Sequence, residues 1–184
     1  MTLTVAEVRQ SPLRISALLA CGAGLNQQTG AMALVVGAVA PDFTLEGWAD
    51  GQVRSFTLSE QRGRPVALIF YPGDERLICT RQMCSYSDGM STLRRHGAAV
   101  WGIAPQDVDS HRSFAEGRHL TMPLLADTGR SVAQAFAVVG PRNIRRSVFV
   151  LDADGRVAWR HVSALNISFP SVEDISGALE AVAA

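Results

Sequence analysis

The feature that most constrains the fold is an uninterrupted apolar run at residues 66–71, which lies between two prolines. Proline cannot donate to a sheet ladder, so Pro65 and Pro72 mark where such a segment begins and ends. An apolar, partly β-branched run of this kind is typical of a strand that is buried on both faces, in the middle of a sheet covered by helices. The run therefore predicts a layered α/β domain with this strand near its centre.

The rest of the chain continues this alternation of buried strands and helices. Further strands are expected at residues 98–103 and 147–151, and a turn at 152–155 leads from the second of these into a partner strand at 157–161. Ser171 has the position of an N-cap, with two acidic residues in the following turn. Helices are expected at about 79–95, 108–118, 131–136 and 171–183.

A domain boundary is expected after residue 33, because residues 22–30 have the Gly/Gln/Thr-rich composition of a linker. Residues 34–184 then form one domain, and residues 1–33 a loosely ordered or helical N-terminal extension. Cys21 ends an apolar stretch at 15–20, an arrangement that loosely resembles a lipoprotein cleavage box. That stretch is shorter than the roughly 7–15 residues of a signal-peptide core. We therefore predict a cytoplasmic protein, with a lipoprotein anchored through Cys21 as the minor alternative.

The charged residues and cysteines argue against several classes of function. The 17 acidic and 17 basic side chains cancel, and every basic one is an arginine. A neutral balance gives no general attraction to nucleic acid or to an anionic membrane, so neither is expected as a partner. The absence of lysine excludes Schiff-base chemistry. Three cysteines are too few for a disulfide scaffold and suit a reducing compartment.

Cys79 lies where the helix after the central strand is expected to begin. A helix N-terminus carries partial positive charge and free N–H groups, which favour a thiolate over a thiol. Arg76 and Arg81 flank it in sequence and are expected to add to that effect. The thiolate is the nucleophilic form of cysteine, so this placement indicates covalent or redox chemistry. The alternative interpretation is a small, buried and unreactive cysteine.

Cys84 follows Cys79 by five residues. On an ideal helix this spacing places the two Cα atoms roughly 8.6 Å apart. A disulfide needs about 4.4–6.8 Å, so the pair can bond only if the helix unwinds. The spacing therefore favours a transient disulfide over a structural one. A zinc site would need two more ligands at suitable spacing, and we expect neither a metal nor a cofactor.

From about residue 34 onward the sequence resembles peroxiredoxins of the bacterioferritin-comigratory or peroxiredoxin Q type, in the AhpC/TSA superfamily. The resemblance implies a thioredoxin-like fold, with a central mixed sheet flanked by helices. It also implies a thiol peroxidase, a monomer or weak homodimer, that reduces hydrogen peroxide and organic hydroperoxides and is regenerated by thioredoxin or a similar dithiol. The matching segments are 36–45, 70–72 leading to Cys79 and Thr80, 102–103 followed by 109–111, 123–127 and 146–152.

The same resemblance assigns roles to individual residues. It places the peroxidatic cysteine at Cys79 and the resolving cysteine at Cys84. Arg146 matches the arginine that holds the thiolate and stabilises charge on the departing oxygen. Pro72 matches the proline that shields the site from water.

Three residues depart from the family pattern. Arg76 stands where a threonine hydroxyl normally bonds both peroxide and thiolate, and its guanidinium offers N–H donors instead. Gln82 replaces a frequent glutamate, and Val148 replaces Thr or Ser. The Arg76 substitution keeps open a second hypothesis, a non-catalytic or redox-sensing thioredoxin-like binding protein. The scattered histidines are expected at the surface or in supporting positions: His96, His111, His119 and His161.

Overall fold

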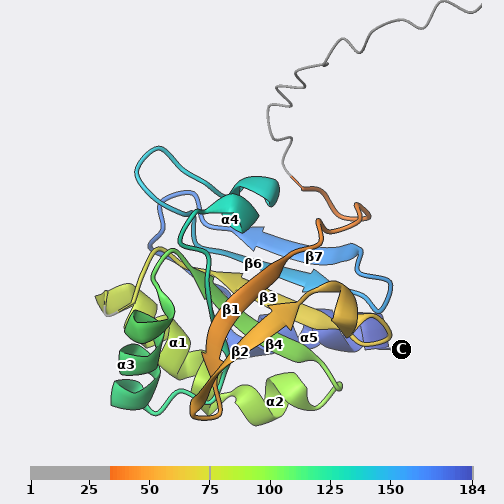
Figure 1. Cartoon of the computed structure of the whole chain (residues 1–184). Helices are drawn as coiled ribbons and strands as arrows, with labels where there is room; N and C mark the ends of the chain where they lie inside the picture. The colour runs from red at the N-terminus through yellow and green to blue at the C-terminus, as the bar shows by residue number, and fades with distance from the viewer. Residues whose placement is uncertain (1–33, 75, 184) are drawn as a thin grey trace, which may run out of the picture.

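The computed structural model describes residues 34–74 and 76–183. Within them, one seven-stranded mixed sheet has the strand order β2-β1-β5-β4-β3-β6-β7 (Figure 1). The strands are β1 (Thr44–Ala49), β2 (Gln52–Thr57), β3 (Val66–Phe70), β4 (Ala99–Ala104), β5 (Leu124–Ala126), β6 (Ser147–Leu151) and β7 (Val157–Val162). The helices are α1 (Leu77–Asp88), α2 (Met90–Arg94), α3 (Val108–Arg118), α4 (Ser131–Ala135) and α5 (Val172–Ala183), with a 3-10 turn at Ser59–Gln61.

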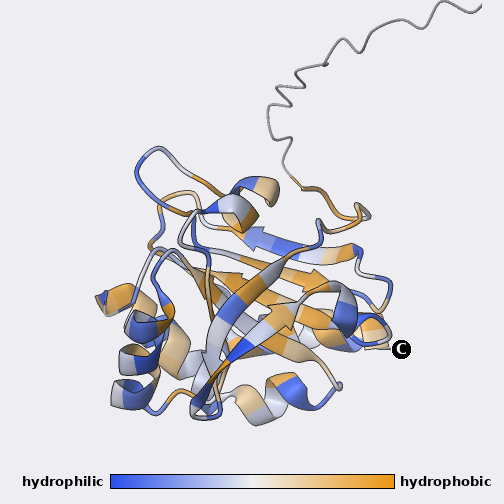
Figure 2. Cartoon of the chain, viewed as in Figure 1, coloured by the Kyte–Doolittle hydropathy of each residue, from blue (hydrophilic) through white to orange (hydrophobic). Residues whose placement is uncertain are grey.

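The apolar run after Pro65 forms β3, and every residue of this strand is buried. It pairs in parallel with β4 and antiparallel with β6, which confirms the predicted interior strand. Successive side chains of a strand point to opposite faces of the sheet. Ala67 and Ile69 pack in one apolar cluster with α1, α2, α3 and α5. Leu68 and Phe70 pack in the other, with α4. Figure 2 shows the central strands as mostly apolar and α3 as largely hydrophilic.

The helix predicted at 79–95 is two helices, because the chain breaks at Gly89 between α1 and α2. A Cβ atom at Gly89 would lie 2.6 Å from the side chain of Val172 at the start of α5. This close approach explains why glycine stands there. The sequence analysis also missed the β1–β2 hairpin and β5. Asp50 and Gly51 both have positive φ, 50° and 79°, as a two-residue hairpin turn requires.

The last helix begins as predicted after Ser171, with a reciprocal pair of hydrogen bonds. The Ser171 hydroxyl accepts from the backbone N–H of Asp174 at 3.1 Å, and the Asp174 carboxylate accepts from the N–H of Ser171 at 2.9 Å. The backbone N–H and the side chain of Ser171 stabilise the ionised carboxylate and hold the pKa of Asp174 below its ordinary value. No helix in the described part of the chain is long and apolar enough to span a membrane.

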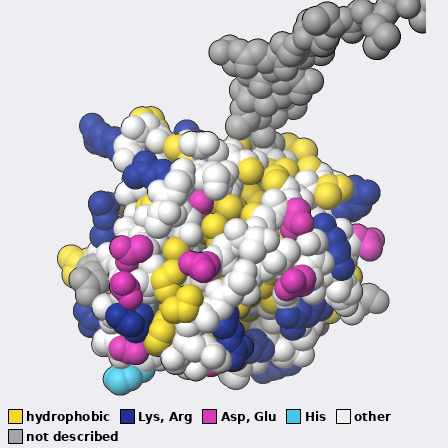
Figure 3. All heavy atoms as spheres, viewed as in Figure 1, with side chains coloured by type: hydrophobic (Ala, Val, Ile, Leu, Met, Phe, Trp, Pro, Cys, Tyr) yellow, Lys and Arg dark blue, Asp and Glu magenta, His cyan; other side chains and the backbone are white. Residues whose placement is uncertain are grey.

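The predicted extension, and Cys21 within it, lie outside the described residues. Acidic and basic side chains are interspersed over the face of the domain seen in Figure 3. This distribution agrees with the zero net charge. Any concentration of charge that matters for function is therefore local.

Candidate active site

Cys79 lies in the first turn of α1, at the end of the loop that follows β3. Its side chain is buried, with 1% exposed. The residue before the helix, Arg76, has extended backbone and makes no side-chain cap. The N–H groups of this first turn are therefore not occupied by a capping side chain, and their partial charge favours an anion nearby.

Arg146 directly contacts the Cys79 sulfur. It immediately precedes β6, and the antiparallel register of β6 with β3 pairs Ser147 with Phe70. This register brings Arg146 beside the loop that carries Cys79. Its Nη2 donates a hydrogen bond to Sγ at 3.3 Å. The structure places Arg146, and not its neighbour Arg145, against the sulfur.

The other partners of the Arg146 side chain are neutral. Nη1 donates to the amide oxygen of Gln82, Nε donates to the backbone carbonyl of Asn166 at 3.4 Å, and the guanidinium lies 6.0 Å from the centre of the Phe169 ring. Arg146 is only 1% exposed. Among these contacts, Cys79 is the one group that can become an anion and balance the buried positive charge. Gln82 therefore orients the Arg146 side chain and leaves its positive charge in place, whereas a glutamate at this position would neutralise that charge.

Cys79 and Arg146 line a cavity of about 1150 Å³. Arg76, which stands at the position of the family threonine, lines it too, with an exposed side chain. Arg81, expected beside the thiol, is exposed and does not line the cavity, because two residues along a helix turn a side chain by about 200°. Two arginines that were not predicted from the sequence line the cavity, Arg142 and Arg145.

Pro72 and Cys84 complete the predicted site. Pro72 is buried, lines the cavity, and accepts a hydrogen bond from the side-chain amide of Asn143 at 3.0 Å. Cys84 is half-buried on α1, and both it and Cys79 are free thiols. Because α1 is continuous through both residues, their ideal spacing of roughly 8.6 Å between Cα atoms forbids a disulfide in this conformation. Among the described residues, no group of acidic, histidine and cysteine side chains has the arrangement of a metal site.

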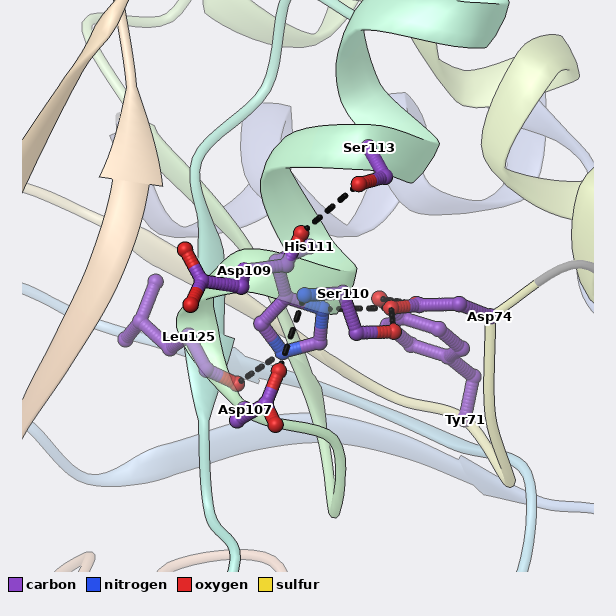
Figure 4. Close-up of polar contacts among 8 residues, drawn as sticks. All are labelled: Tyr71, Asp74, Asp107, Asp109, Ser110, His111, Ser113 and Leu125. Atoms are coloured by element: carbon purple, nitrogen blue, oxygen red, sulfur yellow. Dashed lines mark hydrogen bonds and ion pairs between the residues drawn. The ribbon is translucent and has the colours of Figure 1, made fainter.

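The loop between β3 and α1 is fixed by a buried polar network that the sequence analysis missed (Figure 4). The carboxylate of Asp74 accepts hydrogen bonds from the Tyr71 hydroxyl at 2.8 Å and the Ser110 hydroxyl at 2.9 Å. Its third partner is Nδ1 of His111 at 2.8 Å. Burial and the nearby carboxylate raise the pKa of Tyr71 well above its ordinary value, so the phenol stays protonated and donates.

Both ring nitrogens of His111 face acceptors. Nε2 lies 3.1 Å from the backbone carbonyl of Leu125, which can only accept, so Nε2 carries a proton. Nδ1 lies 2.8 Å from the Asp74 carboxyl group, so the buried ring of His111 joins α3 to the loop before Cys79 by hydrogen bonds at both of its nitrogens. The sequence predicted His111 only as a surface or supporting residue. The one signal of this network in the sequence was the aspartate in the loop between Pro72 and Cys79.

Tyr71→Phe is expected to lower the free energy of unfolding by about 1.5–3 kcal/mol, because it removes a buried donor to a charged acceptor. The matched control is Tyr86→Phe. The Tyr86 hydroxyl donates to the neutral carbonyl of Pro170 at 2.7 Å and accepts a weak 3.4 Å bond from Gln82. Its loss is expected to cost about 0.5–1.5 kcal/mol. Urea denaturation of both variants measures the difference, and equal costs would argue against an ionised Asp74.

A family model described as the AhpC/TSA family matches residues 36–160, more than half of the chain. The chain therefore belongs to the AhpC/TSA family.

Peroxiredoxin Q of rice chloroplasts (Oryza sativa subsp. japonica) is 36% identical over 147 residues, which cover 74% of this chain and 65% of the relative. A relative from Mycobacterium tuberculosis, provisionally named a peroxiredoxin, is 35% identical over 132 residues, which cover 67% of this chain and 82% of the relative. The chain thus spans slightly less than two thirds of the rice protein.

Solved structures confirm the predicted fold. AhpC of Enterococcus faecalis superposes with a TM-score of 0.74 at 20% identity, covering 82% of this chain and 92% of that one. Peroxiredoxin Q of Xanthomonas campestris superposes with a TM-score of 0.67 at 23% identity, covering 77% and 92%. The domain has the thioredoxin-like fold of the peroxiredoxins, a mixed sheet flanked by helices.

Proposed function

We propose that the chain is a thiol-dependent peroxidase that reduces hydrogen peroxide and organic hydroperoxides. The observation that carries this proposal is the pairing of a buried thiol with a buried guanidinium in the lining of a cavity, with Arg146 Nη2 at 3.3 Å from Cys79 Sγ. Membership of the AhpC/TSA family supports it. The positive charge and the first turn of α1 stabilise a thiolate, the form of cysteine that attacks peroxides.

In the first step the thiolate of Cys79 attacks the distal oxygen of the hydroperoxide. The S–O bond forms as the O–O bond breaks, and the sulfur is oxidised by two electrons to a sulfenic acid. The departing alkoxide or hydroxide takes up a proton and leaves as an alcohol or water. The Arg146 guanidinium stabilises the negative charge as it moves from sulfur to the leaving oxygen. Pro72, which lines the same cavity, limits the access of water to the thiol in this proposal.

In the second step Cys84 resolves the sulfenic acid. Its sulfur attacks the Cys79 sulfur, a disulfide forms, and the hydroxyl group leaves as water. The first turns of α1 must unwind before the two sulfurs can meet, because the intact helix holds the residues too far apart. An external dithiol then reduces the disulfide by exchange. We propose thioredoxin or a similar protein for that role, and a cytoplasmic monomer or weak homodimer as the active form.

Cys84→Ser is expected to stop the reaction at the sulfenic acid. Treating the reduced wild-type protein with one equivalent of hydrogen peroxide yields an intramolecular disulfide, detected by mass spectrometry as the loss of two hydrogen atoms. Cys84→Ser instead gains one oxygen atom, which dimedone traps at Cys79. Steady-state turnover with thioredoxin is lost in the variant, while its first encounter with peroxide keeps the wild-type rate.

Cys21→Ser is the control for this experiment, since Cys21 is the remaining thiol of the chain. It is expected to form the same intramolecular disulfide as the wild type. A disulfide that persists in Cys84→Ser and disappears in Cys21→Ser would assign the resolving role to Cys21.

One observation favours a second candidate function, a redox-sensing or binding protein without turnover. Arg76 occupies the position of the family threonine, and its side chain is exposed at the cavity. A missing hydroxyl at this point removes one ligand of the peroxide. The two functions are separated by stopped-flow oxidation of the reduced protein. A rate no faster than that of a free thiol would favour the binding protein.

A further inference from the structure

The cavity at Cys79 is far larger than hydrogen peroxide requires. Its volume is about 1150 Å³. A water molecule, similar in size to hydrogen peroxide, occupies about 30 Å³ of liquid. Pockets for drug-sized ligands span about 300–1,000 Å³. The volume exceeds this range slightly, so the cavity has room for an organic molecule with a hydroperoxide group at one end.

One part of the cavity wall is apolar and exposed. Leu77 and Leu165 are 90% and 74% exposed, and Ile78 is 38% exposed. All three line the cavity, from the first turn of α1 and from the loop after β7. Exposed apolar side chains in the cavity that holds a reactive thiol provide a surface on which the hydrocarbon part of a substrate can be buried.

The remainder of the cavity is rich in positive charge. Arg76, Arg142 and Arg145 line it with exposed side chains, in addition to the buried Arg146. None of the three exposed arginines forms an ion pair with another described residue. No described residue that lines the cavity is acidic. In a chain whose net charge is zero, this is a local excess of positive charge beside a hydrophobic wall.

We propose that Arg76, Arg142 and Arg145 form a subsite for anionic hydroperoxides, in which an apolar skeleton carries a hydroperoxide at one end and a carboxylate at the other. The skeleton packs on Leu77 and Leu165, and the hydroperoxide reaches Cys79. The carboxylate binds the guanidinium groups, whose paired N–H donors match the two oxygens of a carboxylate. This inference rests on the proposed peroxidase function and adds a substrate class to it. The arginine that replaces the family threonine then contributes to specificity.

The test compares two probes that differ only in charge, cumene hydroperoxide with a carboxylate on its ring and the methyl ester of the same molecule. The readout is the second-order rate constant for oxidation of the reduced protein, measured by stopped flow. Each exposed arginine that meets the carboxylate is expected to favour the acid by about two- to fivefold. The ratio of acid to ester should fall in Arg142→Gln/Arg145→Gln and in Arg76→Thr, and should fall for the wild type as salt is added.

Arg118→Gln is the matched control, because it removes an exposed arginine at the end of α3 that does not line the cavity. Its acid-to-ester ratio should equal that of the wild type. A wild-type ratio near one, or a ratio that changes equally in Arg118→Gln and Arg142→Gln/Arg145→Gln, overturns the subsite while leaving the peroxidase in place. Failure to react with hydrogen peroxide as well as with both probes overturns the peroxidase itself.

Discussion

Cys79→Ser is expected to slow the consumption of peroxide to the rate at which ordinary free thiols react with peroxide. The side chain is the one nucleophile of the described residues that lines the cavity and contacts Arg146. A serine hydroxyl is a far weaker nucleophile than a thiolate at neutral pH, and it cannot form a disulfide with Cys84. The substitution is nearly isosteric, so the fold should persist.

Stopped-flow mixing of the reduced protein with hydrogen peroxide measures this loss. Cys84→Ser is the informative comparison, because it keeps Cys79 and is expected to consume one equivalent of peroxide at the wild-type rate. Cys79→Ser is expected to consume none on that timescale. Near-wild-type consumption by Cys79→Ser would contradict the assignment of the peroxidatic cysteine, and far-ultraviolet circular dichroism verifies that the variant is folded.

The central part of the fold could be predicted from the sequence because its signal is local. The apolar run bounded by Pro65 and Pro72 is β3, and the second and third apolar runs are β4 and β6. The elements that were missed depend on contacts distant in sequence. β5 has only three residues, and its pairing with β1 and β4 defines it. The predicted helix divides at Gly89, which has no side chain because Val172, far along the chain, packs against it.

The candidate site divides in the same way. Cys79 could be placed at a helix start because the strand, the loop and the helix are consecutive. The charge around it could not be assigned from sequence distance. Arg81 is two residues away and points elsewhere, whereas Arg142 and Arg145 reach the cavity from the segment before β6. Which arginines surround a thiol is decided by the register of β6 on β3, and composition does not contain that information.

The supporting residues were the hardest to predict, since each has an ordinary role when considered alone. Gln82 is one polar residue of a helix until the structure places its amide oxygen against Arg146. His111 is one of four histidines until both of its nitrogens are seen to bond buried acceptors. Buried polar groups of this kind are stable only when every donor and acceptor is satisfied, and that condition can be examined only in three dimensions.

Arg146→Gln is expected to slow the reaction of Cys79 with hydrogen peroxide by about 10²–10³-fold, the usual effect of losing one donor aimed at developing charge. The guanidinium contacts the sulfur from which negative charge departs, and its neutral partners leave its own charge available. Arg146→Lys keeps the positive charge but loses the planar guanidinium, whose two NH₂ groups donate to Gln82 and to Cys79 at the same time. Its rate should fall between those of the wild type and Arg146→Gln.

Because Arg146 is buried, the experiment must separate a chemical effect from a change of fold. Iodoacetamide alkylation of Cys79 as a function of pH provides that readout, since only the thiolate reacts. Loss of the positive charge should move the alkylation profile of Arg146→Gln to higher pH, while Arg118→Gln, with the same change in net charge, keeps the wild-type profile. A folded Arg146→Gln protein with a wild-type profile and a wild-type rate would show that Arg146 only packs against the thiol. A slower rate with a shifted profile assigns it to the stabilisation of charge on sulfur and oxygen.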